Sequence, residues 1–180
     1  MKDKEKIINK PSYHMLIAIR RKKDNDKDCK ELVFRQIIRD INIDEQILKS
    51  RIKSYPGVWR IYHTVNARSH ASARKLLMKW LIDFPEDSYR IDVLFKTFLL
   101  KKESKVTRNF LLDIDTNNRK IFNEIKDILL INKIKILIDT PTLNGYHLVT
   151  TKFDTRLLDN FNDVTILRDG YYLYDSVTIK

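Results

Sequence analysis

The chain has 180 residues, of which 35 are Lys or Arg and 24 are Asp or Glu, giving a formal net charge of +11. Its single cysteine, Cys29, excludes an intramolecular disulfide framework and a cysteine-rich zinc site. Its three glycines are too few for the Gly-rich loops that hold phosphates in P-loop and dinucleotide-binding proteins. No apolar run approaches the ~20 residues that span a bilayer, so we expect no membrane association and a cytoplasmic or other intracellular location.

The positive charge is concentrated in the first part of the chain. Residues 1–110 contain 26 basic and 14 acidic side chains, whereas residues 111–180 contain 9 and 10. A basic surface attracts polyanions, of which nucleic acid is the commonest, although a solvated lysine-rich surface has the same composition. The imbalance predicts that the two parts of the chain have different partners.

The first sixty-six residues alternate between strand and helix patterns. Residues 1–12 are expected to form a frayed, charged tail. The segment 31–41 fits either a strand or a helix, and its β-branched residues favour a strand that forms a hairpin with the one before it. Around it we expect a strand, a short helix and a second strand, at 13–20, 44–53 and 58–66.

The clearest helix is predicted at 69–83. Ser69 is a suitable N-cap, and Phe84-Pro85 ends the segment. A shorter helix is expected at 91–100. The apolar residues of the first helix recur at helical spacing: Ala73, Leu76, Leu77, Trp80, Leu81 and Phe84.

The last third of the chain predicts one helix among several strands. An amphipathic helix is expected at 117–130. The order of elements indicates an α+β fold in which helices pack on a largely antiparallel sheet, and the absence of repeats and linkers indicates a single domain over 13–180. The strands are expected at 109–115, 134–138 and 146–150, with a terminal hairpin of 164–167 and 171–174 around Arg168-Asp169-Gly170.

Two carboxylates in the first of these strands suggest a metal site. Side chains alternate along a strand, so Asp113 and Asp115 project from one face, about 6.6 Å apart at ~3.3 Å per residue. A divalent cation between them would remove their mutual repulsion. Alternatively, the strand ends at Asp113 and Asp115 caps the following helix.

The segment Thr140-Pro141-Thr142-Leu143-Asn144-Gly145-Tyr146-His147 is the second candidate. Asn144-Gly145 predicts a tight turn, after which His147 begins the next strand. One strand–helix–strand unit separates His147 from the carboxylates, an order that can bring them to one face of a sheet. The alternative is that His147 is a structural histidine.

These residues resemble the catalytic core of the archaeo-eukaryotic primase superfamily, in particular its primase-polymerase branch in phages and plasmids. That superfamily has an hhDhD/E strand, a small-x-His motif and a later hD/E acid on an RRM-like sheet. Leu111-Leu112-Asp113-Ile114-Asp115 matches the first motif, and Gly145-Tyr146-His147, preceded by Thr-Pro, matches the second. The chain departs from the pattern in having Leu143-Asn144-Gly145 where the family often has Ser-Gly-Gly.

The resemblance implies a two-metal site for Mg²⁺ or Mn²⁺. Asp113, Asp115 and a third acid would be the catalytic metal ligands. Asp169, after the apolar strand at 164–167, is our choice for the third acid, and Asp175 and Asp163 are the alternatives.

The resemblance also implies the substrates. His147, with Asn144 and Gly145, would contact the triphosphate of a dNTP or NTP. The activity would be metal-dependent, template-directed nucleotidyl transfer on single-stranded or primed DNA or RNA, with a helicase or other replication protein as a further partner. Residues 109–180 would then bind metal and nucleotide, and residues 13–108 nucleic acid. A non-catalytic nucleic-acid or nucleotide binder on the same fold, or a metal nuclease, is the alternative.

The strand at 58–66 contains the predicted nucleic-acid contacts. Arg60 and Tyr62 share one strand face, and Asn66 and Arg68 lie at its exit. Arginine and aromatic side chains interleaved on a sheet face can pair with phosphates and stack on bases. An ordinary half-buried strand with polar residues facing water would show the same pattern.

Overall fold

The computed structural model describes residues 12–26 and 28–180 and divides the chain into two compact units. The larger one, the sheet unit, contains residues 14–66 and 108–180. The smaller one, the helical unit, contains residues 67–107 together with Ser12 and Tyr13. The helices of residues 67–107 pack on each other within this unit. The single domain over 13–180 stays a prediction. The predicted tail lies outside the described residues except for Ser12.

The fold is α+β, as predicted, with antiparallel sheets and packed helices. No helix in the described part of the chain has the length and apolar character needed to cross a membrane.

The first sheet has the strand order β2-β1-β3-β9, and every neighbouring pair is antiparallel. One face packs on α1, around a core of Leu16, Ala18, Leu48, Ile52, Trp59 and Ile61. Because side chains alternate along β3, Arg60 and Tyr62 lie on the opposite face. The elements are β1 (Ser12–Arg20), β2 (Leu32–Ile38), α1 (Ile41–Ile52), β3 (Gly57–Thr64) and β9 (Tyr171–Ile179).

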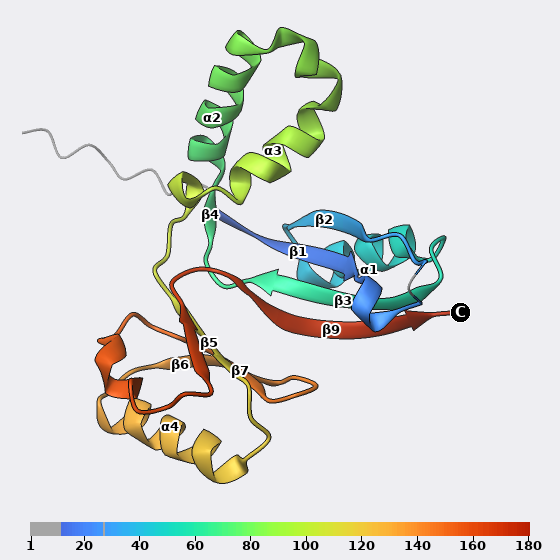
Figure 1. The fold of residues 1–180 in the computed structure, drawn as a ribbon. Coiled ribbons are helices and arrows are strands. Elements are labelled where there is room, and N and C mark those ends of the chain that lie inside the picture. The colour runs from blue at the N-terminus through green and yellow to red at the C-terminus, as the bar shows by residue number, and fades with distance from the viewer. Residues whose placement is uncertain (1–11, 27) are drawn as a thin grey trace, which may run out of the picture. The chain divides into compact units, whose positions relative to one another are not determined.

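The second sheet has the order β6-β7-β5-β8, which is the second, third, first and fourth of its strands along the chain. This is the split β-α-β-β arrangement of an RRM-like sheet, with the short 3-10 turn η4 (Thr155–Leu158) in place of a second helix. Figure 1 shows α4 along one face of this sheet. The elements are β5 (Phe110–Ile114), α4 (Arg119–Ile131), β6 (Ile136–Pro141), β7 (Tyr146–Thr150) and β8 (Val164–Leu167).

Alternation along β5 sends its side chains to two environments. Phe110, Leu112 and Ile114 pack against Phe122, Ile125 and Leu129 of α4. Leu111 and Asp113 therefore point away from the helix, and Leu111 packs with Val65, Val149 and Tyr172. The helix-free face of β5 is where the one polar residue of the strand, Asp113, lies.

The predicted terminal hairpin is wrong. β8 pairs with β5 of the second sheet, whereas β9 pairs with β3 of the first. A tight hairpin turn needs a residue with positive φ, and among the three glycines only Gly57 has one. Residues 168–170 therefore carry the chain from one sheet to the other, and Val177 and Ile179 of β9 pack against the α1 core.

The helical unit is built on two helices that pack side by side (Figure 1). Ser69 is the N-cap of the first, as predicted, and its hydroxyl accepts a hydrogen bond from the Ser72 N–H. Ala73 and Leu77 of α2 and Leu94, Phe98 and Leu99 of α3 are buried. The elements are β4 (Arg68–Ser69), α2 (His70–Asp83), η2 (Pro85–Arg90), α3 (Ile91–Leu99) and η3 (Lys102–Ser104).

The sheet unit contains a stack of rings with an unusual histidine. The ring of His63 lies 4.8 Å from His14 and 5.1 Å from Tyr172, and its Nδ1 is 2.8 Å from the carbonyl oxygen of Thr64. Burial, together with the neighbouring His14, lowers the pKa of His63 from 6.5 to about 4. His63 is therefore neutral in the folded protein at neutral pH.

The low pKa of His63 predicts a loss of stability in mild acid. In the unfolded chain His63 takes up a proton near pH 6.5, whereas in the folded chain it does so only near pH 4. The stabilisation by neutral His63 is therefore fully present above pH 6.5 and decreases as the pH falls from 6.5 to 4. We expect urea denaturation to show a decrease of up to about 3 kcal/mol from this residue between pH 7.5 and pH 4. The variant His63→Gln should have a flatter pH dependence; an unchanged slope would contradict the assignment.

Candidate functional site

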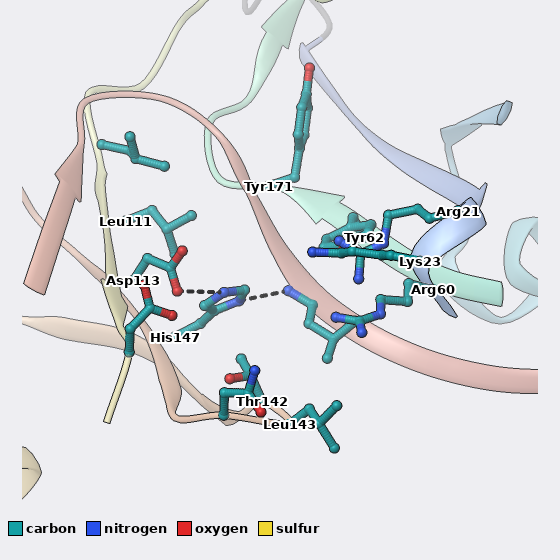
Figure 2. A pocket seen from close by; sticks show the side chains of 14 residues that line it. Arg21, Lys23, Arg60, Tyr62, Leu111, Asp113, Thr142, Leu143, His147 and Tyr171 are labelled. Carbon is teal, nitrogen blue, oxygen red and sulfur yellow. Dashed lines mark hydrogen bonds and ion pairs between the residues drawn. The ribbon is translucent and has the colours of Figure 1, made fainter. Parts of the chain in front are cut away.

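A pocket of about 250 Å³ in the sheet unit is lined by residues of both sheets. Arg60 and Tyr62 come from β3 and Asp113 from β5, in each case from the face that does not pack on a helix. Figure 2 shows Asp113 on one side of the pocket and Arg21, Lys23 and Arg60 on the other. The pocket therefore has an acidic wall and a cationic wall.

Asp113 and Asp115 form the acidic wall. The side chain of Asp113 is 37% exposed, and Asp115, directly after β5, is exposed. The Asp115 N–H donates to the carbonyl oxygen of Asp163 (2.8 Å), whereas the N-cap of α4 is Asn118, which accepts from the Lys120 N–H. Asp115 is therefore not the helix cap that the alternative interpretation required, and both carboxylates line the pocket.

His147 holds Asp113 in place. The two residues are opposite each other on β7 and β5, and His147 Nε2 is 3.2 Å from Asp113 Oδ1. Nδ1 of the same ring accepts a hydrogen bond from the backbone N–H of Leu173 on β9 (2.9 Å; Figure 2). A backbone N–H can only donate, so Nδ1 carries a lone pair and the proton of the neutral ring is on Nε2, the atom that lies 3.2 Å from the carboxylate oxygen.

The cationic wall is organised by a single aspartate. Asp24 accepts from Arg21 Nε and from Arg60 Nη2, both at 2.7 Å. Burial alone would raise the pKa of Asp24, but these two arginines outweigh it and hold the pKa below its usual value. One carboxylate thus serves two guanidinium groups, and Lys23 adds a third cation to the wall.

Arg21 has a hydrogen-bonding group that the described residues leave unsatisfied. Its Nη2 atom is buried and has no hydrogen-bond partner among them. A buried N–H group without a partner is costly, and an anionic oxygen in the pocket would supply the missing acceptor.

The turn between β6 and β7 forms the rim of the pocket through Thr142, Leu143 and Asn144. The Thr142 N–H donates to the carbonyl oxygen of Gly145 (2.8 Å). A Cβ atom on Gly145 would lie only 1.8 Å from the carbonyl oxygen of Ile114, so only glycine allows the turn to cross the end of β5. Gly145, predicted to bind nucleotide, supports the rim and does not itself line the pocket.

Asp169 does not reach the pocket. Its Oδ1 accepts from Asn66 Nδ2 (3.0 Å) and from the Gly170 N–H (3.1 Å). Of the alternatives for the third acid, Asp175 forms an ion pair with Lys49 (2.7 Å), and neither it nor Asp163 lines the pocket. The structure thus brings together two of the three predicted acids.

Two of the predicted nucleic-acid contacts are buried. Asn66 is 0% exposed. Its side-chain amide donates to the carbonyl oxygen of Asn109 and accepts from the Asn109 N–H, as the backbone of a neighbouring strand would. Arg68 is 1% exposed. Neither side chain presents a surface to a nucleic acid, whereas Arg60 and Tyr62 lie on one face of β3, as predicted, and line the pocket.

The donor set of the pocket fits a cation that arrives with a phosphate ligand. Within residues 12–26 and 28–180, no group of three His, Cys, Asp or Glu side chains is arranged to hold a metal ion. Mg²⁺, however, is usually bound by one or two carboxylates, with substrate phosphates and water completing the coordination. Asp113 and Asp115 are suitable as such a pair.

Sequence reasoning missed two of the three cations of the cationic wall. Arg21, the N-cap of η1 (Lys22–Asp24), and Lys23 within it line the pocket, although neither residue was predicted to have a role. The signal was the run Arg20-Arg21-Lys22-Lys23 at the end of a strand. What the run does not reveal is that this end of β1 lies near β5, which follows ninety residues later.

A scan against protein-family models, a search of curated proteins and a search of solved structures found no match to this chain. The resemblance to the primase superfamily therefore depends on the motif residues themselves.

The close approach at Gly145 predicts a strong effect of a single methyl group. Gly145→Ala should reduce the free energy of unfolding by more than about 2 kcal/mol, because the new Cβ would overlap a backbone carbonyl group. Gly170→Ala is the matched control, since its Cβ would meet its first neighbour at an ordinary 3.4 Å and its φ is not positive. Equal stability of the two variants in urea denaturation would contradict this account.

The hydrogen bonds predict opposite tautomers for two histidines. His147 should be protonated on Nε2, because Nδ1 accepts from Leu173. His63 should be protonated on Nδ1, because that atom faces the Thr64 carbonyl oxygen. Long-range ¹H–¹⁵N NMR spectra at neutral pH distinguish the two forms, and a His147 ring protonated on Nδ1 would contradict the proposed link to Asp113.

Proposed function

We propose that the pocket binds the polyphosphate of a nucleoside triphosphate together with a divalent cation, and that the protein catalyses template-directed nucleotidyl transfer of the primase-polymerase type. The observation that carries the proposal is that two carboxylates and three cations face each other in one pocket. The motif residues Asp113, Asp115 and His147, on which the resemblance depends, all lie there.

The charge distribution favours a polyphosphate that carries a bound cation over a free polyphosphate or a free cation. Arg21, Lys23 and Arg60 attract phosphate oxygens, and guanidinium groups match phosphates with paired N–H donors. The carboxylates opposite would repel the same ligand unless a cation lay between them and the phosphates. A ligand that combines a divalent cation with several phosphates satisfies both walls.

The roles of the side chains follow from their positions. Asp113 and Asp115 would hold the cation, and His147 keeps the Asp113 carboxylate oriented toward the pocket. Arg21 and Arg60, fixed by Asp24, would bind the phosphates and stabilise the charge that develops on the leaving pyrophosphate. When bound, the cation supplies the Lewis acid that favours attack by a primer 3′-hydroxyl.

A non-catalytic nucleotide binder is the second candidate. This candidate is favoured because two carboxylates line the pocket, whereas the primase resemblance implies three. Two carboxylates are enough to retain a metal-bound triphosphate, whereas a second metal ion in the two-metal mechanism calls for further ligands. Synthesis and binding therefore need separate measurements.

The test is an extension assay on primed and unprimed single-stranded DNA with Mg²⁺ or Mn²⁺ and labelled dNTPs or NTPs. Asp113→Asn and Asp115→Asn should each reduce synthesis at least about 100-fold, because each removes a ligand charge. Asp139→Asn is the matched control: Asp139 is an exposed residue of β6 that pairs with Lys126 outside the pocket, so its loss should leave synthesis unchanged.

The remaining outcomes separate the candidates. Metal-dependent triphosphate binding without synthesis would favour the non-catalytic binder. Shortening of the DNA would favour a nuclease. Synthesis that survives both aspartate substitutions would exclude this pocket as the active site.

A further inference from the structure

The longest stretch of the chain without acidic residues ends in the helical unit. Residues 46–82 contain no Asp or Glu and eight Lys or Arg. Such a segment has a strongly positive local potential unless tertiary contacts neutralise it. The structure shows which of these cations are compensated.

Several cations of this segment are used within the fold. Lys49 pairs with Glu45 and Asp175, and Arg60 pairs with Asp24. Arg51 lies over the ring of Phe34, with 5.5 Å between the guanidinium carbon and the ring centroid. Arg68 is buried. Apart from Lys53, the remaining cations are on one helix, α2.

The exposed face of α2 combines cations with apolar side chains. Ala73 and Leu77 turn toward α3 and are buried. The opposite side of the helix includes five exposed residues at helical spacing, which we call the outer face: Arg74, Lys75, Met78, Lys79 and Ile82. Met78 and Ile82 are 53% and 77% exposed.

The cations of the outer face are not neutralised by neighbouring carboxylates. Within the described helical unit, ion pairs join Arg90 to Asp87 and Lys96 to Asp92, and none involves α2. The acidic residue of α2 is Asp83, the last of the helix. Three exposed cations within six residues thus form a compact positive surface.

We propose that the outer face of α2 binds a single-stranded nucleic acid. Closely spaced cations suit a phosphate backbone, and exposed apolar side chains between them can contact the unpaired bases of a single strand. A lipid surface fits less well, because an amphipathic helix binds membranes through a wide apolar face, whereas the two exposed apolar side chains here lie among three cations.

This inference goes beyond the pocket and does not require it to be catalytic. A template-directed enzyme needs a surface for its template strand, and two of the residues predicted for that purpose, Asn66 and Arg68, are buried. The outer face supplies a surface of the required charge. Failure of this inference can be distinguished from failure of the proposed function, because oligonucleotide binding and triphosphate binding are measured separately.

The experiment compares two triple variants of the full chain. Arg74→Gln/Lys75→Gln/Lys79→Gln removes the positive charge of the outer face. Lys53→Gln/Lys120→Gln/Lys135→Gln removes the same charge from exposed positions elsewhere. Affinity for a fluorescent 25-nucleotide single strand is measured by anisotropy at several salt concentrations, and thermal melting verifies that both variants fold.

The outer-face variant should bind the oligonucleotide at least about tenfold more weakly at ~0.1 M salt, because it loses three phosphate contacts. The slope of log affinity against log salt should become shallower by about 2, since each contact to a single strand contributes about 0.7. The control variant should lose less than about threefold. Equal losses in the two variants would overturn the proposal.

A second variant tests the contact with bases. Met78→Ser/Ile82→Ser should weaken binding of the single strand severalfold without changing the salt slope, because it removes apolar contacts and no charge. Binding of a duplex of the same length should be unaffected by this change. An equal loss for single strand and duplex, or no loss for either, would overturn the assignment to single strands.

Discussion

The pocket depends on His147, which accepts a hydrogen bond from the Leu173 N–H at Nδ1 and contacts the Asp113 carboxylate through Nε2. Leu173 belongs to the first sheet, whereas the other two residues belong to the second. A neutral imidazole has one acceptor and one donor, so the ring serves both partners in only one tautomer and one orientation. One side chain therefore joins the two sheets beside the pocket and directs a carboxylate into it.

The pocket also depends on keeping its opposite charges apart. In the described part of the chain, no ion pair joins Asp113 or Asp115 to the cations of the facing wall. Asp24 holds Arg21 and Arg60 on their own side, and His147 holds Asp113 on the other. A direct pair across the pocket would neutralise both walls and occupy the space that a ligand needs. Each wall instead has a partner of its own.

The two compact units present different chemistry to a polyanion. The pocket of the sheet unit combines carboxylates with cations, which is the set of groups that the proposed metal-bound triphosphate would need. The outer face of α2 in the helical unit has cations and apolar side chains without carboxylates, which suits a long chain bound by charge and base contact. This is the division that nucleotidyl transfer on a template would require.

The sequence by itself determined most of the elements and one wall of the site. Period-2 alternation in Leu111-Leu112-Asp113-Ile114-Asp115 and the cap at Ser69 are local signals, and local sterics and hydrogen bonding enforce them. They were enough to place the acidic pair and His147 near each other, one strand–helix–strand unit apart. Topology within that short unit leaves few alternatives.

Only the tertiary structure decided what depends on distant pairing. Three features follow from contacts between segments far apart in the sequence. β9 pairs with β3 instead of β8, Arg21 faces Asp113 across the pocket, and Asn66 is buried against Asn109. Strand patterns are equally compatible with several partners, and the choice is made by how apolar faces pack into common cores. For the same reason Asp169, which follows an apolar strand as the motif requires, is directed away from the pocket.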